Sequence, residues 1–498
     1  MSEMEKYISV VETAERWNVS PRRIQILCNE NRIKGAKKQS GIWFIPYGAK
    51  KPERIKSGVK NEENKVLNVL SLFSGCGGMD LGFEGGFDVL AKSVNMHMHK
   101  DWKIKKSKDG WVRLPKNKFH TVFANDIKPE AKAAWSNYFG KRGLETSSYY
   151  LDSIVDLVKL QKENKINIFP EGIDIVTGGF PCQDFSVSGK RMGFDTDKGH
   201  NGKKIDINAP TVENRGHLYM WMREVIAITK PKMFIAENVK GLTNLNDAKE
   251  IIENDFSSVC NGGYLVVPAR VLNAACYGVP QGRERVIFYG FKKSELTDEA
   301  KKQLSAKVIS SEYDPYPIPT HYLSKKFCNE NEIHYVNVKQ AFYGLEEPKQ
   351  SLDISQQKFS KAKFMGKHCQ GQQEVKLEGI GPTIRSEHHG NIEFRRLSKE
   401  HGGIYIKELE EGNEERRLTV RECARIQTFP DDYEFIIPKK DGNSSVSASE
   451  AYKIIGNAVP PLLAFNIARR LQDKACIYAG FRHLFYQMAL VWLYLWGE

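Results

Sequence analysis

The chain has 498 residues, 41% of them apolar and 27% charged, a composition typical of a globular protein and unlike that of a disordered one. Residues 1–20 lack the apolar core of a secretory signal, and no uncharged apolar run reaches roughly 18 residues, so we expect a cytoplasmic protein without a membrane partner. The nine cysteines are odd in number and include no C-x-x-C pair, which argues against a disulfide framework or a zinc ribbon. A net charge of +13 favours a polyanionic partner, with nucleic acid first.

The first 65 residues form a basic region, with fourteen Lys/Arg against eight Asp/Glu, and they end in a polar, linker-like stretch. Five apolar residues recur there at helical spacing around a predicted turn: Ala14, Trp17, Val19, Ile24 and Leu27. Together with a short predicted strand, this pattern resembles the winged helix-turn-helix of excisionase-like and MerR-like DNA-binding modules. That resemblance implies DNA contacts near the N-terminus of the second helix, from Arg22, Arg23 and Gln25. A small helical adaptor with a solvated basic face is the alternative.

The main body begins with a predicted buried strand over residues 66–73, followed by a glycine turn and an amphipathic helix. Glycines in such a turn let a ligand approach the helix N-terminus, as in nucleotide-binding βαβ units, and a tight structural turn is the alternative. A second strand ends in Asp126, which can accept hydrogen bonds from ribose hydroxyls, while Asp152 and Ser153 could reach an adenine amino group. These features predict a nucleoside cofactor. An insert rich in Lys and Trp, residues 92–118, separates the first two strands.

A cysteine follows the next predicted strand, in the stretch G-I-D-I-V-T-G-G-F-P-C at residues 172–182. Sites in doubly wound α/β folds lie at the carboxyl edge of the sheet, and this strand delivers Cys182 there. Pro181 stiffens the loop, and the nearby Lys190 and Arg191 favour the thiolate, which is the nucleophilic form. A lone cysteine is more often an inert core residue, which is the alternative.

Two further strands bring charged side chains to the same edge of the sheet. The strand in residues 230–239 ends near Glu237, whose carboxyl can give or take a proton beside a thiolate. The strand after it carries Gln281, Arg283 and Arg285 at a spacing of two residues, which places them on one face. Two neighbouring guanidinium groups suit a phosphate or a developing anion, and salt-bridged surface arginines are the alternative.

Six sequence blocks carry a resemblance to a known family. The blocks are F-S-G-C-G-G-M-D-L-G-F (73–83), G-G-F-P-C-Q-D-F-S (178–186), E-N-V-K-G-L (237–242), Q-G-R-E-R (281–285), T-V-R-E-C-A-R-I-Q-T-F-P (419–430) and G-N-A-V-P-P (456–461). In these blocks and their order the chain resembles bacterial DNA (cytosine-5)-methyltransferases of the restriction-modification type. The resemblance implies an α/β fold with a doubly wound, Rossmann-like domain that binds S-adenosylmethionine, and a smaller target-recognition domain.

The resemblance also implies a role for each candidate residue. Cys182 would add to C6 of a flipped-out cytosine, and Glu237 would act at N3 of that base. Arg285 would contact the carbonyl oxygen of the base, and Arg283 the loop after Cys182. Eleven residues would hold the cofactor: Phe73, Ser74, Gly75, Gly77, Asp126, Ile127, Asp152, Ser153, Pro181, Asn457 and Val459. Ten would contact double-stranded DNA: Gln183, Ser186, Lys190, Arg191, Arg385, His388, His389, Asn391, Arg395 and Arg396.

We expect five segments in the chain. They are a DNA-binding module (1–56), a linker (57–65), a catalytic domain (66–291 and 419–473), a target-recognition domain (292–418) and an apolar tail (474–498). The tail is too short for a membrane anchor, so it should dock as a helix or form an exposed end. No metal is expected, because the His388–His389 pair lacks a Cys or carboxylate at ligand spacing.

Three activities are compatible with these residues. The prediction is a monomeric enzyme that methylates a specific DNA site and protects host DNA from a cognate restriction endonuclease. A tRNA-directed methyltransferase would use the same chemistry, but the long recognition region favours duplex DNA. A DNA-binding regulator without catalysis is an alternative of another class, and the intact Cys182, Glu237 and Arg285 argue against it. The DNA sequence that would be methylated does not follow from these residues.

Overall fold

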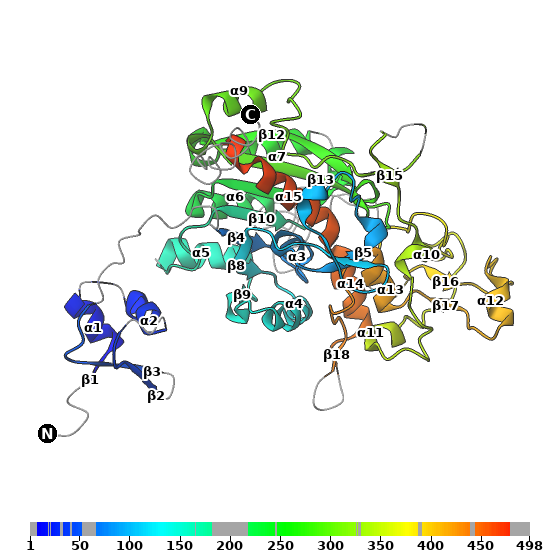
Figure 1. The fold of residues 1–498 in the computed structure, drawn as a ribbon, viewed down its shortest axis with the longest axis horizontal. Coiled ribbons are helices and arrows are strands. Elements are labelled where there is room, and N and C mark those ends of the chain that lie inside the picture. The colour runs from blue at the N-terminus through cyan, green and yellow to red at the C-terminus, as the bar shows by residue number, and fades with distance from the viewer. Residues whose placement is uncertain are drawn as a thin grey trace, which may run out of the picture. The chain divides into compact units, whose positions relative to one another are not determined.

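The computed structural model describes residues 7–17, 19, 21–29, 33–39, 42–51, 66–164, 166–181, 218–244, 247–324, 326, 330–386, 391–438 and 444–478. The chain divides into two compact units, residues 1–62 and 63–498, and each is described by itself (Figure 1). Among the helices of these residues, none combines the length and the apolar character needed to cross a bilayer.

The larger unit is built on a mixed sheet of seven strands in the order β12-β13-β11-β10-β4-β8-β9. The strands are β4 (Leu67–Leu72), β8 (Phe119–Asn125), β9 (Tyr149–Tyr150), β10 (Ile175–Gly179), β11 (Met233–Val239), β12 (Tyr264–Asn273) and β13 (Glu284–Lys292). β10 runs parallel to its neighbours β4 and β11, whereas β13 is antiparallel to β11 and β12. The carboxyl ends of β4, β10 and β11 therefore meet at one edge, as the sequence predicts.

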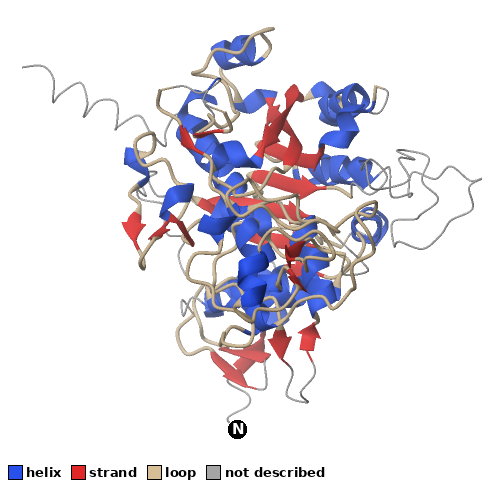
Figure 2. Ribbon diagram, turned by 90° about the vertical axis from the view of Figure 1, so that its right-hand side faces the viewer, coloured by secondary structure: helices blue, strands red, loops and turns tan. Residues whose placement is uncertain are grey.

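Helices cover both faces of this sheet, so that the red strands in Figure 2 lie between blue helices. They are α3 (Gly78–Glu84), α4 (Pro129–Lys141), α14 (Ala448–Asn457) and α15 (Pro461–Tyr478) on one face, and α5 (Ile154–Asn164), α6 (Leu218–Thr229), α7 (Ala248–Ser257) and α8 (Val259–Gly262) on the other. Strand β4 shows the division residue by residue. Leu67 and Val69 join the core with α3 and α15, while Leu70 and Leu72 join the core with α5 and α6. The predicted α/β fold is confirmed.

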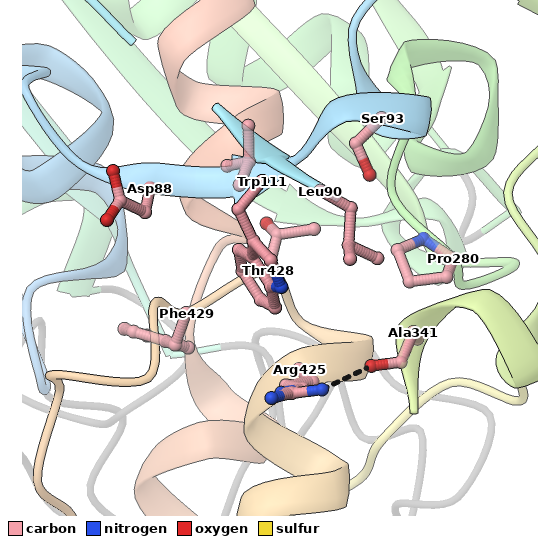
Figure 3. Close-up of a pocket in the computed structure, with 10 residues that line it drawn as sticks. Asp88, Leu90, Ser93, Trp111, Pro280, Ala341, Arg425, Thr428 and Phe429 are labelled. Atoms are coloured by element: carbon pink, nitrogen blue, oxygen red, sulfur yellow. Dashed lines mark hydrogen bonds between the residues drawn. The ribbon is translucent and has the colours of Figure 1, made fainter. Parts of the chain in front are cut away.

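The insert at residues 92–118 adds a small antiparallel sheet beside the central one. Its strands lie in the order β5 (Asp88–Leu90), β7 (Trp111–Arg113), β6 (Lys105–Lys106). Leu90 and Trp111 pack in a cluster with Val336 and Ala341, so the insert is anchored on the segment that follows the central sheet. Figure 3 shows Trp111 beside Arg425 and Thr428, around an enclosed space of about 10 Å³, which is enough for one water molecule.

Residues 292–438 form a region of short elements. They are α9 (Asp298–Leu304), β14 (His321–Tyr322), β15 (Ile333–His334), α10 (Val338–Ala341), α11 (Ile354–Gln357), β16 (Phe394–Arg396), α12 (Ile406–Glu410), β17 (Arg416–Arg417), α13 (Val420–Ile426) and β18 (Ile437–Pro438), which pairs with β19 (Ser444–Val446). With so few long strands or helices, side chains provide much of the cohesion. Buried Arg396 pairs with Glu347 and Glu408, and buried Arg416 pairs with Glu347 and Glu422.

The smaller unit contains two short helices and a three-stranded sheet. They are β1 (Tyr7–Ser9), α1 (Val10–Trp17), α2 (Pro21–Asn29), β2 (Lys37–Gln39) and β3 (Ile42–Pro46), with β3 central and antiparallel to both neighbours. The predicted apolar positions Ala14, Trp17, Ile24 and Leu27 are buried in one cluster with Ile45. At the other end of the chain α15 continues to Tyr478, past the expected end of the catalytic domain, and residues 479–498 of the tail lie outside the described residues.

Candidate active site

A cavity of about 420 Å³ opens at the carboxyl edge of the central sheet. Loops after four strands and the segment between α14 and α15 contribute to its walls. Of the predicted cofactor residues, nine line it: Phe73, Ser74, Gly75, Asp126, Ile127, Ser153, Pro181, Asn457 and Val459. Three of the predicted catalytic residues line the same cavity: Glu237, Arg283 and Arg285. The structure thus brings together side chains from positions 73 to 459 at one site.

The turn after β4 is shaped by backbone conformations in the left-handed region. Gly75 has φ 53°, which glycine adopts at little cost, but Phe73 has φ 52°, which a residue with a Cβ rarely adopts. Strain of this kind persists where surrounding contacts hold it, and it is frequent at ligand sites. The sequence gives no sign that Phe73 is strained.

Asp126 secures this turn from the neighbouring strand β8. Its Oδ2 accepts a hydrogen bond from the Gly75 N–H at 3.0 Å, and its Oδ1 accepts one from the Lys128 N–H at 3.0 Å. Burial raises the pKa of the Asp126 carboxyl above its ordinary value, against the effect of Lys128 and of these N–H donors. The carboxylate is therefore fixed in place at the cavity wall, where the sequence predicts a ribose contact.

Two of the predicted cofactor contacts need correction. Gly77 does not line the cavity; its φ is 77°, and a Cβ there would stand 2.5 Å from Phe139 and 2.6 Å from Trp135, so packing against α4 explains this glycine. The neighbouring Gly78 lines the cavity instead, and a Cβ on it would stand 2.2 Å from the Val459 carbonyl oxygen. Asp152 is exposed and is not part of the cavity wall. Motif position alone did not tell which glycine faces the ligand.

Glu237 and Arg285 form a buried ion pair at this edge. The Arg285 Nε lies 2.6 Å from the Glu237 Oε1, and the two side chains are 10% and 9% exposed. Burial raises the pKa of the Glu237 carboxyl above its ordinary value, and the charges of Arg285 and Arg283 oppose that shift. The pair is tight against β10, because a Cβ on Gly179 would stand 2.7 Å from the Glu237 Oε2. Such a carboxyl can hold a proton and donate it to a ring nitrogen.

Arg283 and Gln281 connect the cavity to the rest of the unit. The two terminal nitrogens of Arg283 donate to the carbonyl oxygens of Ile384 (2.9 Å) and Gly456 (2.8 Å). Gln281 donates to Gln427 at 3.0 Å and accepts from the Ile384 N–H at 3.1 Å. These contacts indicate a positioning role for both side chains. The predicted contact of Arg283 with the loop after Cys182 stays a prediction, since that loop lies outside the described residues.

Several predicted residues fall outside the described part of the chain. They are Cys182, Gln183, Ser186, Lys190, Arg191, His388 and His389, together with the side chains of Arg22 and Arg23. The two residues before Cys182 are described: Pro181 lines the cavity, and the Phe180 carbonyl accepts a hydrogen bond from the Asn238 amide at 3.2 Å. The chain therefore enters residue 182 from a fixed position beside Glu237.

Three of the arginines predicted to contact DNA, namely Arg385, Arg395 and Arg396, form ion pairs within the protein. Arg396 is 1% exposed and pairs with Glu347 and Glu408, so the structure contradicts its predicted DNA contact. Arg395 also pairs with Glu408, and its side chain is 12% exposed. Arg385 pairs with Glu393 and donates to the Asn391 carbonyl. Their acidic partners stand up to 49 positions away in the sequence, so the pairing could not be inferred from the local pattern.

The sequence of the chain is similar to those of known DNA methyltransferases. Residues 67–473 match the family described as C-5 cytosine-specific DNA methylase. The chain is 31% identical over 445 residues to the type II methyltransferase M.BspRI of Lysinibacillus sphaericus, covering 86% of this chain and 87% of that one. It is 30% identical over 426 residues to M.BsuRI of Bacillus subtilis, covering 83% and 80%. It is 27% identical over 488 residues to M.Eco47II of Escherichia coli, covering 93% of each.

The chain belongs to the C-5 cytosine-specific DNA methylase family, and it is a DNA (cytosine-5)-methyltransferase. Its methyl donor is S-adenosylmethionine. The residues of the cavity fit that cofactor: Asp126 offers a fixed carboxylate for ribose hydroxyls, and Phe73 and Ile127 offer apolar surface. Its substrate is DNA.

Proposed function

We propose that the chain methylates C5 of a flipped-out cytosine at a specific duplex site through a covalent adduct with Cys182. The observation that carries the proposal is the Glu237–Arg285 pair, which lines the same cavity as the cofactor residues and Pro181. A cofactor pocket alone would suit many reactions. A protonatable carboxyl and a guanidinium next to the residue before a cysteine suit addition to a pyrimidine.

Each reacting group has a defined task in this proposal. The Cys182 thiolate adds to C6, so the C5–C6 π electrons form a C4–C5 double bond. The C4–N3 π electrons move to N3, which takes the proton of Glu237. S-adenosylmethionine supplies the methyl group that C5 accepts. Loss of the C5 proton to a base then restores the C5–C6 double bond and expels the thiolate, and the proton on N3 returns to Glu237. The buried Glu237 is poised for its part because desolvation raises its pKa.

The remaining parts of the proposal concern DNA. The target base must leave the duplex, at a cost of a few kcal/mol, to reach a cavity at the sheet edge. We propose that the helices α1 and α2 with the β1–β3–β2 sheet act as an accessory DNA-binding module of the winged helix-turn-helix type. Methylation of the recognition site would protect host DNA from a cognate restriction endonuclease. Deletion of residues 1–56 should weaken DNA binding and leave the rate at saturating DNA nearly unchanged.

Expression in cells that lack cytosine methylation tests the catalytic assignment. Bisulfite or nanopore sequencing should show 5-methylcytosine at one fixed sequence in DNA from cells with the native chain. The Cys182→Ser variant should give none while it still binds DNA and cofactor. Cys260→Ser, at an exposed cysteine, is the matched control and should methylate normally. Methylation by Cys182→Ser would remove that residue from the proposed role.

A further inference from the structure

The net positive charge of the chain is concentrated in two segments. Residues 92–118 carry nine Lys/Arg and two Asp, a net charge of +7. Residues 1–65 carry a net charge of +6. Since the whole chain has a net charge of +13, residues 66–91 and 119–498 together are balanced, although they include the catalytic core and the recognition region. The insert therefore contributes a net charge of +7 to the methyltransferase unit, and the rest of that unit sums to zero.

The insert is held rigidly, so its charges have a fixed position. Trp111 and Leu90 are buried against α10, and Arg425 lies over the Trp111 ring at 4.9 Å (Figure 3). Lys108 reaches across to Asp431 at 2.7 Å. In the same contact region the Tyr343 hydroxyl donates to Asp109 at 2.8 Å. These anchors join the insert to the start of the recognition region and to α13.

Four lysines of the insert take no part in these anchors. Lys100, Lys103, Lys105 and Lys106 are exposed, and within the described residues their ammonium groups have no hydrogen bond or ion pair. By contrast, the basic side chains at 108 and 113 are paired with Asp431 and Asp88. A cluster of unpaired ammonium groups repels itself, which costs stability unless an anion binds. Protection of the edge strand β6 from pairing with other chains is the competing explanation.

We propose that the insert, residues 92–118, is a second DNA-contacting surface, whose lysines bind backbone phosphates of the duplex outside the recognition site. The proposal rests on the DNA substrate and not on the Cys182 chemistry. Lysine ammonium groups neutralise phosphates without reading base edges, so the surface adds affinity that is independent of sequence. Because the insert is anchored beside α10 and the end of α13, its basic surface would continue the DNA-binding surface of the recognition region. The rest of the unit, residues 66–91 and 119–498, has a summed net charge of zero.

Direct DNA binding tests the proposal without any turnover. The test variant is Lys100→Gln/Lys105→Gln/Lys106→Gln in the full chain. The control variant is Lys293→Gln/Lys302→Gln/Lys307→Gln, which removes three exposed lysines, and so the same charge, from the surroundings of α9. The probe is a mixed-sequence duplex longer than the protein, and Kd is measured by fluorescence anisotropy between about 50 and 200 mM salt.

Each lysine that contacts a phosphate contributes about 0.9 to the slope of log Kd against log salt. We expect the slope of the test variant to fall by about 2 to 3, with Kd at low salt raised at least about tenfold, and the control variant to match the native chain. Equal slopes for test variant and native chain would overturn the proposal. So would equal losses in both variants, which would indicate net charge alone. Unchanged binding with new self-association of the test variant would instead establish edge protection.

Discussion

Glu237 and Glu422 are both buried carboxylates paired with an arginine, one at the carboxyl edge of the central sheet and the other at the start of α13. Arg285 reaches Glu237 through its Nε, and its Nη1 donates to the Glu284 carbonyl. Arg416 holds both oxygens of Glu422 at 2.8 Å, and the Thr419 N–H adds a third hydrogen bond. Burial raises the pKa of both carboxyls, but only at Glu422 do the partners outweigh it and lower the pKa overall.

The difference teaches how to distinguish a functional pair from a structural one. Both pairs are largely buried. Arg285 lies in one of the six family sequence blocks, and Arg416 lies just before another. The Glu237 pair faces a cavity of about 420 Å³ and leaves its carboxyl ready to take a proton. The Glu422 pair belongs to a closed network with Glu347 and the capping box of α13. Burial of the arginine does not distinguish a functional pair from a structural one. The neighbouring cavity and the direction of the carboxyl pKa shift do distinguish them.

Replacing Glu237 tests the functional side and should have the largest effect. Glu237→Gln keeps the size of the side chain and removes its acidic proton, so the single-turnover rate of methyl transfer should fall by about 10² to 10⁴. Dissociation constants for DNA and cofactor should change little. A rate within tenfold of the native chain, on a folded protein, would show that Glu237 is not the proton donor.

Replacing Glu422 tests the structural side. Glu422→Gln leaves the buried Arg416 without its bidentate partner, and the free energy of unfolding should fall by about 3–5 kcal/mol. Chemical denaturation measures this loss, with Glu411→Gln at an exposed position as control. Methyl transfer per folded molecule should be unchanged. A catalytic defect larger than the loss of folded protein would mean that the two pairs do not differ as described.

Gly78→Ala tests the close contact between α3 and the segment after α14 at the cavity wall. The added Cβ would stand 2.2 Å from the Val459 carbonyl, so the segment after α14 must move. We expect the KM for S-adenosylmethionine to rise about tenfold and stability to fall by about 1–3 kcal/mol. Gly282→Ala is the matched control, because its nearest contact would be an ordinary 3.7 Å. Equal effects at both positions would refute the close approach at Gly78.

The contributions of Glu237 and Glu422 to stability should change with pH in opposite directions. This is the smallest of the predicted effects. Glu237 has a raised pKa in the folded state, so the folded chain binds the extra proton and this contribution is lost as pH rises from about 4.5 through the folded pKa. Glu422 has a lowered pKa, so its contribution is present above about 4.5 and is lost as pH falls through the folded pKa. The difference in melting temperature between the native chain and the Gln variant should therefore fall with rising pH for Glu237 and rise with pH for Glu422. Parallel slopes would contradict the assignment.

Much of the site follows from strand ends in the sequence. Asp126, Glu237 and Arg285 were predicted because parallel strands and their neighbour deliver their ends to one edge, and the structure confirms that they line one cavity. Motif position predicts Gly77 as a cofactor residue, whereas in the structure Gly78 lines the cavity and Gly77 packs against α4. The strained φ of Phe73 has no sequence signature at all.

The recognition region was predicted least well, for a physical reason. Its basic residues look available in the sequence, but Arg396 is neutralised by Glu347, 49 positions earlier, and by Glu408. Long-range ion pairs of this kind depend on how short elements pack, not on local periodicity. Conversely, the Lys- and Trp-rich composition of the insert at 92–118 is evident in the sequence, but which of its lysines are exposed and unpaired depends on the packing of the fold.

The covalent route through Cys182 is tested most directly by trapping. DNA in which the target cytosine is replaced by 5-fluorocytosine is incubated with the chain and S-adenosylmethionine, denatured, and analysed by mass spectrometry. Fluorine cannot leave C5 as the proton does, so we predict a stable complex of protein, DNA strand and one methyl group, attached at Cys182 and absent with Cys182→Ser. A chain that methylates normal DNA yet forms no complex, or a complex attached at another residue, would contradict the account.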